Sequence, residues 1–117
     1  MKYETIEQCT VSAAESSLSS GDFNSLAKQI VSISLYEEDL LAAQNICSRV
    51  AELSHSVARG NAILGLGHLA RRSALLDKNL VSPLIIKALH DTDSYVRGQA
   101  DAAADDIEQF LGWRLRV

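Results

Sequence analysis

A nine-residue segment of this chain returns 38 positions later, and this repeat constrains the fold more than any other feature. Residues 54–62 read Ser-His-Ser-Val-Ala-Arg-Gly-Asn-Ala, and residues 92–100 read Thr-Asp-Ser-Tyr-Val-Arg-Gly-Gln-Ala. Each copy lies among stretches whose apolar residues recur at helical spacing. A period near 40 residues is typical of helical hairpins that stack on one another. Because such stacks most often bind another macromolecule, a binding face is expected in preference to a catalytic pocket.

Apolar spacing predicts six helices in three antiparallel hairpins. Abundant Ala and Leu, an aromatic content of 5% and a single proline also favour helices over a sheet. The expected helices cover residues 4–18, 23–35, 37–53, 57–72, 80–90 and 94–111, and residues 37–39 would be an acidic first turn. The helix at 57–72 is apolar around most of its circumference, which predicts a central position in the stack.

The charge balance argues against nucleic acid as a partner. A formal net charge of −4 offers no positive field to phosphates, and a basic protein partner fits it better. The apolar runs are far shorter than the ~18 residues of a membrane span and no secretory signal is visible, so a cytoplasmic protein is expected. Cys9 and Cys47 show no metal-ligand spacing, so both are interpreted as small buried residues in a reducing compartment.

The second copy of the repeat resembles a known family. Residues 89–100, which place an Asp-containing turn before Val-Arg and a small residue, resemble the HEAT-repeat signature. The upstream copy at 57–62 departs from it, because Ala precedes Arg59 and both turn aspartates are missing. The resemblance covers about residues 37–111 and implies an all-α, right-handed α-α superhelix. The chain would be one domain, 1–117, with a degenerate first repeat or cap at 1–35, repeats at 37–72 and 78–111, and a tail at 112–117.

Residues 59–71, together with 95–98, resemble small bacterial HEAT-like proteins that act as immunity proteins of polymorphic toxin and contact-dependent growth inhibition systems. This resemblance implies a protein that binds a cognate toxin, in particular a basic nuclease domain, and occludes its active site. The free protein would be a monomer and the complex a heterodimer. The alternative is a HEAT-like accessory or scaffold subunit, such as an assembly factor related to bilin lyases. A HEAT-like DNA-repair enzyme would need a basic groove, whereas this chain places acids there.

Four residues of the repeated turns are interpreted as structural. Arg59 and Arg97 occupy the signature position whose side chain bonds to turn carboxylates or carbonyls, although both residues could also contact a partner. Asp91 and Asp93 lie in the matching turn, where carboxylates can accept unpaired backbone N–H groups and pair with arginine.

Three glycines lie within eight residues of one expected helix, at positions 60, 65 and 67. Each glycine inside a helix costs about 0.5–1 kcal/mol relative to alanine, so the run needs an explanation. One explanation is close packing against a neighbouring helix. The other is a shallow groove for a partner, formed by two rows with small residues in the middle. The rows are Asn61, Gly65 and His68 on one helix and Gln99, Ala103 and Asp106 on the next.

The segment 91–108 has a net formal charge of −5, because it contains six acidic residues and one basic residue. Asp101, Asp105, Asp106 and Glu108 form its densest part. This segment is interpreted either as a solvated outer face or as a negative patch that orients a cationic protein. Trp113 would cover the open end of the stack or anchor a partner. The predicted partner-binding residues are Asn61, Gly65, His68, Gln99, Asp101, Asp105, Asp106 and Trp113.

Catalysis is not expected. His68 has no second ligand three or four residues away on its helix, although Asp106 could pair with it across the repeat interface. The chain lacks a phosphate-binding glycine loop, a G-x-S-x-G turn and an H-E-x-x-H helix. The sequence therefore predicts no enzyme, no metal and no cofactor.

Overall fold

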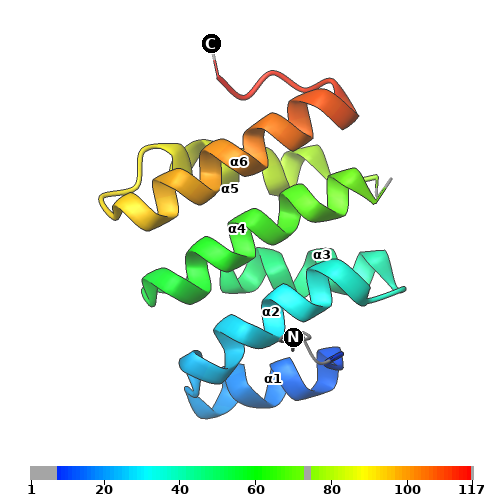
Figure 1. The fold of residues 1–117 in the computed structure, drawn as a ribbon, viewed down its shortest axis with the longest axis vertical. Helices are drawn as coiled ribbons and strands as arrows, with labels where there is room; N and C mark the ends of the chain where they lie inside the picture. Colours follow the sequence, from blue (N-terminus) through cyan, green and yellow to red (C-terminus); the bar gives the residue numbers. More distant parts are fainter. Residues whose placement is uncertain (1–7, 73–74, 117) are drawn as a thin grey trace, which may run out of the picture.

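The computed structural model describes residues 8–72 and 75–116, and these residues form an all-α domain with six helices (Figure 1). The all-α prediction is confirmed, and so is the order of the helices. Their bounds are α1 Val11–Ser20, α2 Phe23–Tyr36, α3 Leu40–Val50, α4 Ser56–Arg71, α5 Lys78–Leu89 and α6 Ser94–Leu111. None of these helices is both long enough and apolar enough to cross a membrane.

A side chain caps the start of every described helix, and these caps explain where the predicted bounds were wrong. Thr10 accepts a hydrogen bond from the Ala13 N–H, so α1 begins at Val11; residues 4–7 of the predicted helix lie outside the described residues. Asp39 caps α3 in the same way through the Ala42 N–H, at 3.0 Å. Residues 37–39 therefore precede α3 and do not form its first turn. Short polar side chains satisfy the amide groups that the first helical turn leaves unpaired.

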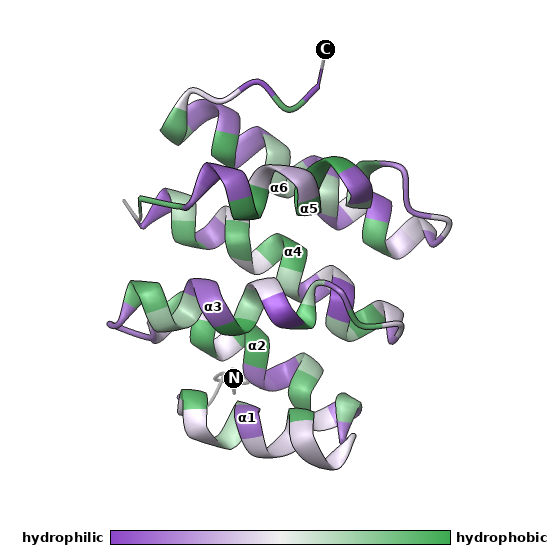
Figure 2. Ribbon diagram, turned by 180° about the vertical axis from the view of Figure 1, so that it is seen from behind, coloured by the Kyte–Doolittle hydropathy of each residue, from purple (hydrophilic) through white to green (hydrophobic). Residues whose placement is uncertain are grey.

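The six helices lie in two layers. In Figure 1, α2, α4 and α6 lie side by side on the near side, and the view from behind in Figure 2 brings α3 and α5 forward. α4 lies in the middle and packs against α2, α3 and α6, as its apolar circumference predicted. The molecule measures 38 × 33 × 29 Å along its principal axes.

The glycines of α4 allow its neighbours to approach closely. A Cβ atom at Gly67 would lie 2.8 Å from the Cα of Ala103 in α6, and one at Gly60 would lie 2.8 Å from the Tyr95 ring. A Cβ atom at Gly65 would lie 3.0 Å from the Cβ of Ser34 on the opposite side of α4. Since α4 is flanked on both sides, the helix accepts the cost of glycine in return for closer packing.

We expect Gly67→Ala to destabilise the protein by about 1–3 kcal/mol, because the added methyl group meets backbone atoms that must move. Gly98→Ala is the matched control: the Cβ position at Gly98 in α6 is open, and removing an interior glycine should add about 0.5–1 kcal/mol. Urea unfolding followed by circular dichroism measures both changes. Equal effects of the two substitutions would contradict the packing explanation.

Candidate functional site

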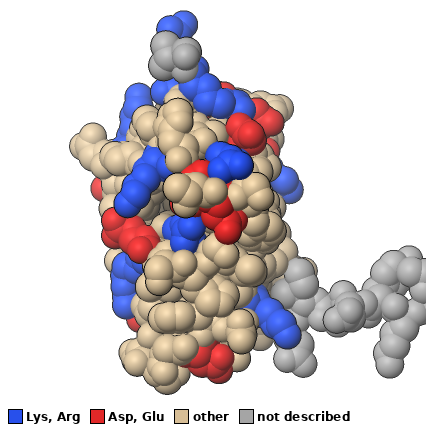
Figure 3. Space-filling model, turned by 90° about the vertical axis from the view of Figure 1, so that its left-hand side faces the viewer, with Lys and Arg blue, Asp and Glu red and all other residues tan. Residues whose placement is uncertain are grey.

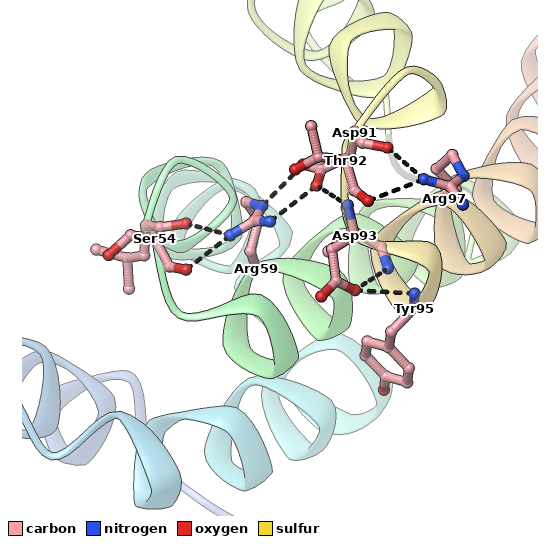
Figure 4. A network of polar contacts seen from close by, with 9 residues as sticks. Ser54, Arg59, Asp91, Thr92, Asp93, Tyr95 and Arg97 are labelled. Carbon is pink, nitrogen blue, oxygen red and sulfur yellow. Dashed lines mark hydrogen bonds and ion pairs between the residues drawn. The ribbon is translucent and has the colours of Figure 1, made fainter.

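A network of hydrogen bonds joins the turn before α4 to the turn before α6 (Figure 4). The Arg59 guanidinium donates from Nη1 to the carbonyl oxygens of Leu53 and Ser54, at 3.0 and 2.9 Å. Its other edge donates from Nε and Nη2 to the two carboxylate oxygens of Asp91, at 3.0 and 2.9 Å. Arg59 therefore holds its own turn and binds the next turn at two points, which is the geometry that a planar guanidinium favours.

Arg97 repeats the first half of this arrangement. Its Nη1 donates to the carbonyl oxygens of Asp91 and Thr92, at 2.8 and 3.0 Å. These acceptors are the 38-residue counterparts of Leu53 and Ser54. The two repeated arginines thus have equivalent environments within their own turns.

The aspartates of the second turn have different tasks. Asp93 caps α6 by accepting from the Tyr95 and Val96 N–H groups. Asp91 accepts from Arg59 and from the Asp93 N–H, and these bonds, led by the one from Arg59, hold the pKa of the Asp91 carboxyl below its ordinary value of 3.8. Both partners of the Arg59–Asp91 pair are mostly shielded, with side-chain exposures of 17% and 13%. Loss of either partner would leave a shielded charge without its counterion.

We expect Asp91→Asn to cost about 1–3 kcal/mol of stability at pH 7, because it removes the charge that Arg59 binds. The lowered pKa means that this stabilisation is present above pH 3.8 and is lost as the pH falls through the folded-state pKa. The difference in the free energy of unfolding between Asp91→Asn and the wild type, measured by urea unfolding, should therefore shrink as the pH falls below 3.8. Asp93→Asn is the control, since asparagine caps helices as well as aspartate does. A difference that stays constant as the pH falls would contradict this role.

The accessible side chains on the outer side of the α2–α4–α6 layer, whose helices lie side by side in Figure 1, are here called the front face. The half-buried or exposed side chains of α4 and α6 recur at the same helical positions, 38 residues apart. The front face consists of Asn24, Lys28, Val31 and Leu35 from α2, Val57, Asn61, Leu64, His68 and Arg71 from α4, and Tyr95, Gln99, Ala102, Asp106 and Gln109 from α6.

Polar bonds between helices fix part of the front face. The Asn61 side chain donates to the Ala27 carbonyl of α2, at 2.9 Å, and accepts from the Tyr95 hydroxyl of α6. The Tyr95 ring lies against Gly60 and is still 41% exposed. Asn61 and Gln99, both predicted partner-binding residues, are partly accessible on this face. From the sequence, Tyr95 at the start of the last helix could either cover the end of the stack or anchor a partner, and the structure places it in α6, 41% exposed.

Gly65 corrects the predicted groove. It is buried, and its Cβ position faces Ser34 and Cys47, so no partner can reach it in this structure. Ala103, the small residue of the second row, is also buried and lies against Gly67. Gly65 leaves the face of Asn61 because four residues turn a helix about 40° beyond one full turn, and the next position of α4 that is not buried is the half-buried Leu64.

His68 lies near Asp106 and Arg71, but among the described residues the side chain of Asp106 pairs with Arg71 and not with His68. Arg71 forms an ion pair of 3.7 Å with Asp106. The pKa of His68 is lowered, mainly by burial and then by the Arg71 charge, while the Asp106 charge opposes the shift. The neutral form of His68 is therefore favoured. Its Nδ1 atom is buried and forms no hydrogen bond with the described residues.

The C-terminal tail places one cation, Arg116, on the predicted negative patch. Arg116 lies across α6 and pairs with Asp105 and Glu108 at 2.5 Å and with Asp101 at 3.7 Å. Arg116 offsets one of these three negative charges, and the side chains of Asp101 and Asp105 stay 67% and 70% exposed, so the interpretation as a solvated face or a negative patch stays a prediction. In the view of Figure 3, acidic and basic side chains also lie next to one another, and neither sign forms a continuous patch. The signal that sequence reasoning missed was Arg116 itself, which follows the helix end at Gly112 closely enough to fold back.

We expect Arg116→Ala to raise the pKa of Glu108 from about 2 toward its ordinary value of 4.5, because Arg116 provides the largest contribution to that shift. A carboxyl ¹³C NMR titration measures the pKa directly. Arg114→Ala is the control, since Arg114 belongs to the same tail and forms none of these ion pairs. An unchanged Glu108 pKa in the Arg116 variant would contradict this pairing.

Trp113 packs partly buried against the core, and the Lys78 ammonium of α5 lies 5.8 Å from the centre of its ring. Leu115 is buried beside it, and its N–H donates to Glu108. The first interpretation of Trp113, a residue that covers the end of the stack, fits this placement better than a partner anchor. The tail thus closes the α5–α6 end of the molecule.

A shallow cavity of about 370 Å³ lies at the edge of the turns. Its lining comprises Ala51, Glu52, Leu53, Arg59, Leu84, Lys87, Ala88, His90, Asp91 and Thr92. No group of three or more His, Cys, Asp or Glu within residues 8–72 and 75–116 is placed to hold a metal ion.

The two cysteines differ in their environments. Cys47 is fully buried, and burial raises the pKa of its thiol to about 12, which makes it a poor nucleophile. Cys9 precedes α1 and is only partly buried, which corrects its interpretation as a core residue.

Comparisons with protein-family models, with curated proteins and with solved structures found no match to this chain. The HEAT and immunity-protein resemblances therefore stay predictions.

Proposed function

We propose that this chain is a protein-binding module of the immunity type, which neutralises a cognate toxin domain by occluding its active site. Its architecture is proposed to be the right-handed HEAT-like superhelix that the sequence resembles. The observation that carries the proposal is the front face, where three consecutive hairpins contribute the same helical positions to one exposed surface.

The composition of the front face suits a protein partner. Val57 and Tyr95 are 44% and 41% exposed and provide apolar and aromatic contact area. The half-buried Gln99 of α6 adds an amide group that can exchange hydrogen bonds with a partner. Interface energy concentrates in aromatic and arginine side chains, and Tyr95 and Arg71 supply both kinds here.

The rigidity of the front face also supports this function. Bonds from Asn61 connect α4 to α2 and α6, while the Arg59–Asp91 pair connects successive turns. Arg72 adds a further connection through the Ser34 carbonyl of α2, at 3.0 Å. A surface that is ordered before binding loses less conformational entropy in the complex, so more of the contact energy appears as affinity.

The charge of the chain determines which toxin fits. The net charge of −4 favours encounter with a basic domain such as a nuclease. The pairing of Asp101, Asp105 and Glu108 with Arg116 offsets one of their three negative charges, so a weaker negative charge stays on this side of α6. The proposed complex is a heterodimer in the cytoplasm, formed by a chain that is monomeric when free.

We expect Leu64→Arg and Ala102→Arg to weaken binding of the cognate toxin domain at least about tenfold, because each places a cation at the centre of the front face. Ile86→Arg is the control, since Ile86 is 40% exposed on α5 in the other layer. Calorimetry with the purified toxin domain encoded beside the gene measures the affinities.

Three outcomes would contradict the proposal or one of its parts. If no such domain binds the wild-type chain, the immunity function fails. Equal affinity for all three variants would show that the front face is not the interface. Charge reversal of Asp101, Asp105 and Asp106 without a change in affinity or salt dependence would remove the electrostatic part.

A further inference from the structure

The contact between Arg59 and Asp91 is a complete example of how this chain binds a carboxylate at a turn. Arg59 is first oriented by the carbonyl oxygens of its own turn, Leu53 and Ser54, and its Nε–Nη2 edge then binds both oxygens of Asp91. The carboxylate comes from a turn that precedes a helix. Asp91 is itself held in place, because one of its oxygens accepts from the Asp93 N–H at 2.9 Å.

The side chain of Arg97 is oriented by its own turn in the same way as that of Arg59, but it has no counterpart of Asp91. Its Nη1 is oriented by the carbonyl oxygens of Asp91 and Thr92, which match the acceptors of Arg59 at a distance of 38 residues. Its Nε–Nη2 edge binds no carboxylate among residues 8–72 and 75–116, and the side chain is exposed. Because the own-turn bonds restrict its rotamers, Arg97 differs from an ordinary flexible surface arginine.

We propose that the Nε–Nη2 edge of Arg97 binds one aspartate carboxylate from a turn of a protein partner, in the two-point geometry that Asp91 adopts on Arg59. This site is separate from the front face, so it does not depend on the proposed function. We infer an Asp-containing turn before a helix as the ligand, because Arg97 carries the charge opposite to a carboxylate and is held by the same own-turn bonds that orient Arg59 toward Asp91.

The side of α6 that carries Arg97 suits a turn of a partner and does not suit a further helical hairpin. The residues of α4 that follow Arg59 at the matching positions are Ile63, Gly67 and Ala70, which are buried. On α6 the matching positions hold the carboxylates of Asp101, Asp105 and Glu108, and Arg116 of the tail pairs with all three. A fourth hairpin would find no apolar surface there, whereas a turn needs only the Arg97 edge.

The test uses the ¹⁵N-labelled wild-type chain and the peptide acetyl-Asp-Thr-Asp-amide, which copies residues 91–93. NMR follows the Nε–Hε resonances of the arginines during titration at constant ionic strength. We expect a saturable shift at Arg97 with an apparent dissociation constant about fivefold lower than at Arg114, because the Arg97 side chain is already ordered. The peptide acetyl-Asn-Thr-Asn-amide should leave Arg97 unchanged.

The same titration of Arg97→Lys separates a two-point site from attraction by charge alone. Lysine keeps the positive charge and loses the planar edge. The shifts that the peptide causes in the backbone amide resonances of the protein's own residues 91–93 should therefore disappear in this variant. Equal dissociation constants at Arg97 and Arg114, no saturable shift at Arg97, or an undiminished response in the lysine variant would each overturn the proposal.

Discussion

One guanidinium group connects the repeats of this protein. Arg59 binds two carbonyl oxygens of its own turn and both carboxylate oxygens of Asp91 in the next turn, so a single planar group joins the turn before α4 to the turn before α6. The pair is mostly shielded from water, where Coulomb attraction is stronger but desolvation also costs more. The planar guanidinium of Arg59 offsets that cost, because its N–H groups donate to four acceptors at once without rearrangement.

The second constraint is how closely the neighbouring helices can approach α4. Its glycines lie against α6 on one side and against α2 and α3 on the other, so the central helix approaches all of its neighbours closely. Close approach brings the turns into register, and the register lets Arg59 reach Asp91. It also brings the exposed positions of three helices onto one surface, which is the basis of the proposed protein-binding function. Packing in the core and accessibility on the front face are therefore two results of the same arrangement.

Charge has a different role from the one that sequence composition indicated. The acids of α6 are close in the sequence and would repel one another on an isolated helix. In the folded chain Arg116 lies over three of them, and Arg71 lies beside Asp106. The tail therefore relieves repulsion between the acids of α6, and Leu115 and Trp113 add apolar contacts between the tail and the core.

Local features of the sequence determined the six helices, their order and most of their bounds, because apolar periodicity and capping residues such as Asp22 and Asp77 act within a few neighbours. The 38-residue repeat also identified Arg59, Arg97, Asp91 and Asp93 as turn residues. Tertiary structure alone decided that Gly65 is buried while Leu64 faces outward, and that Arg116 reaches the acids of α6. These outcomes depend on which side of a helix meets its neighbour and on where a tail folds back. Both are set by contacts between residues far apart in the chain, which spacing along one helix does not encode.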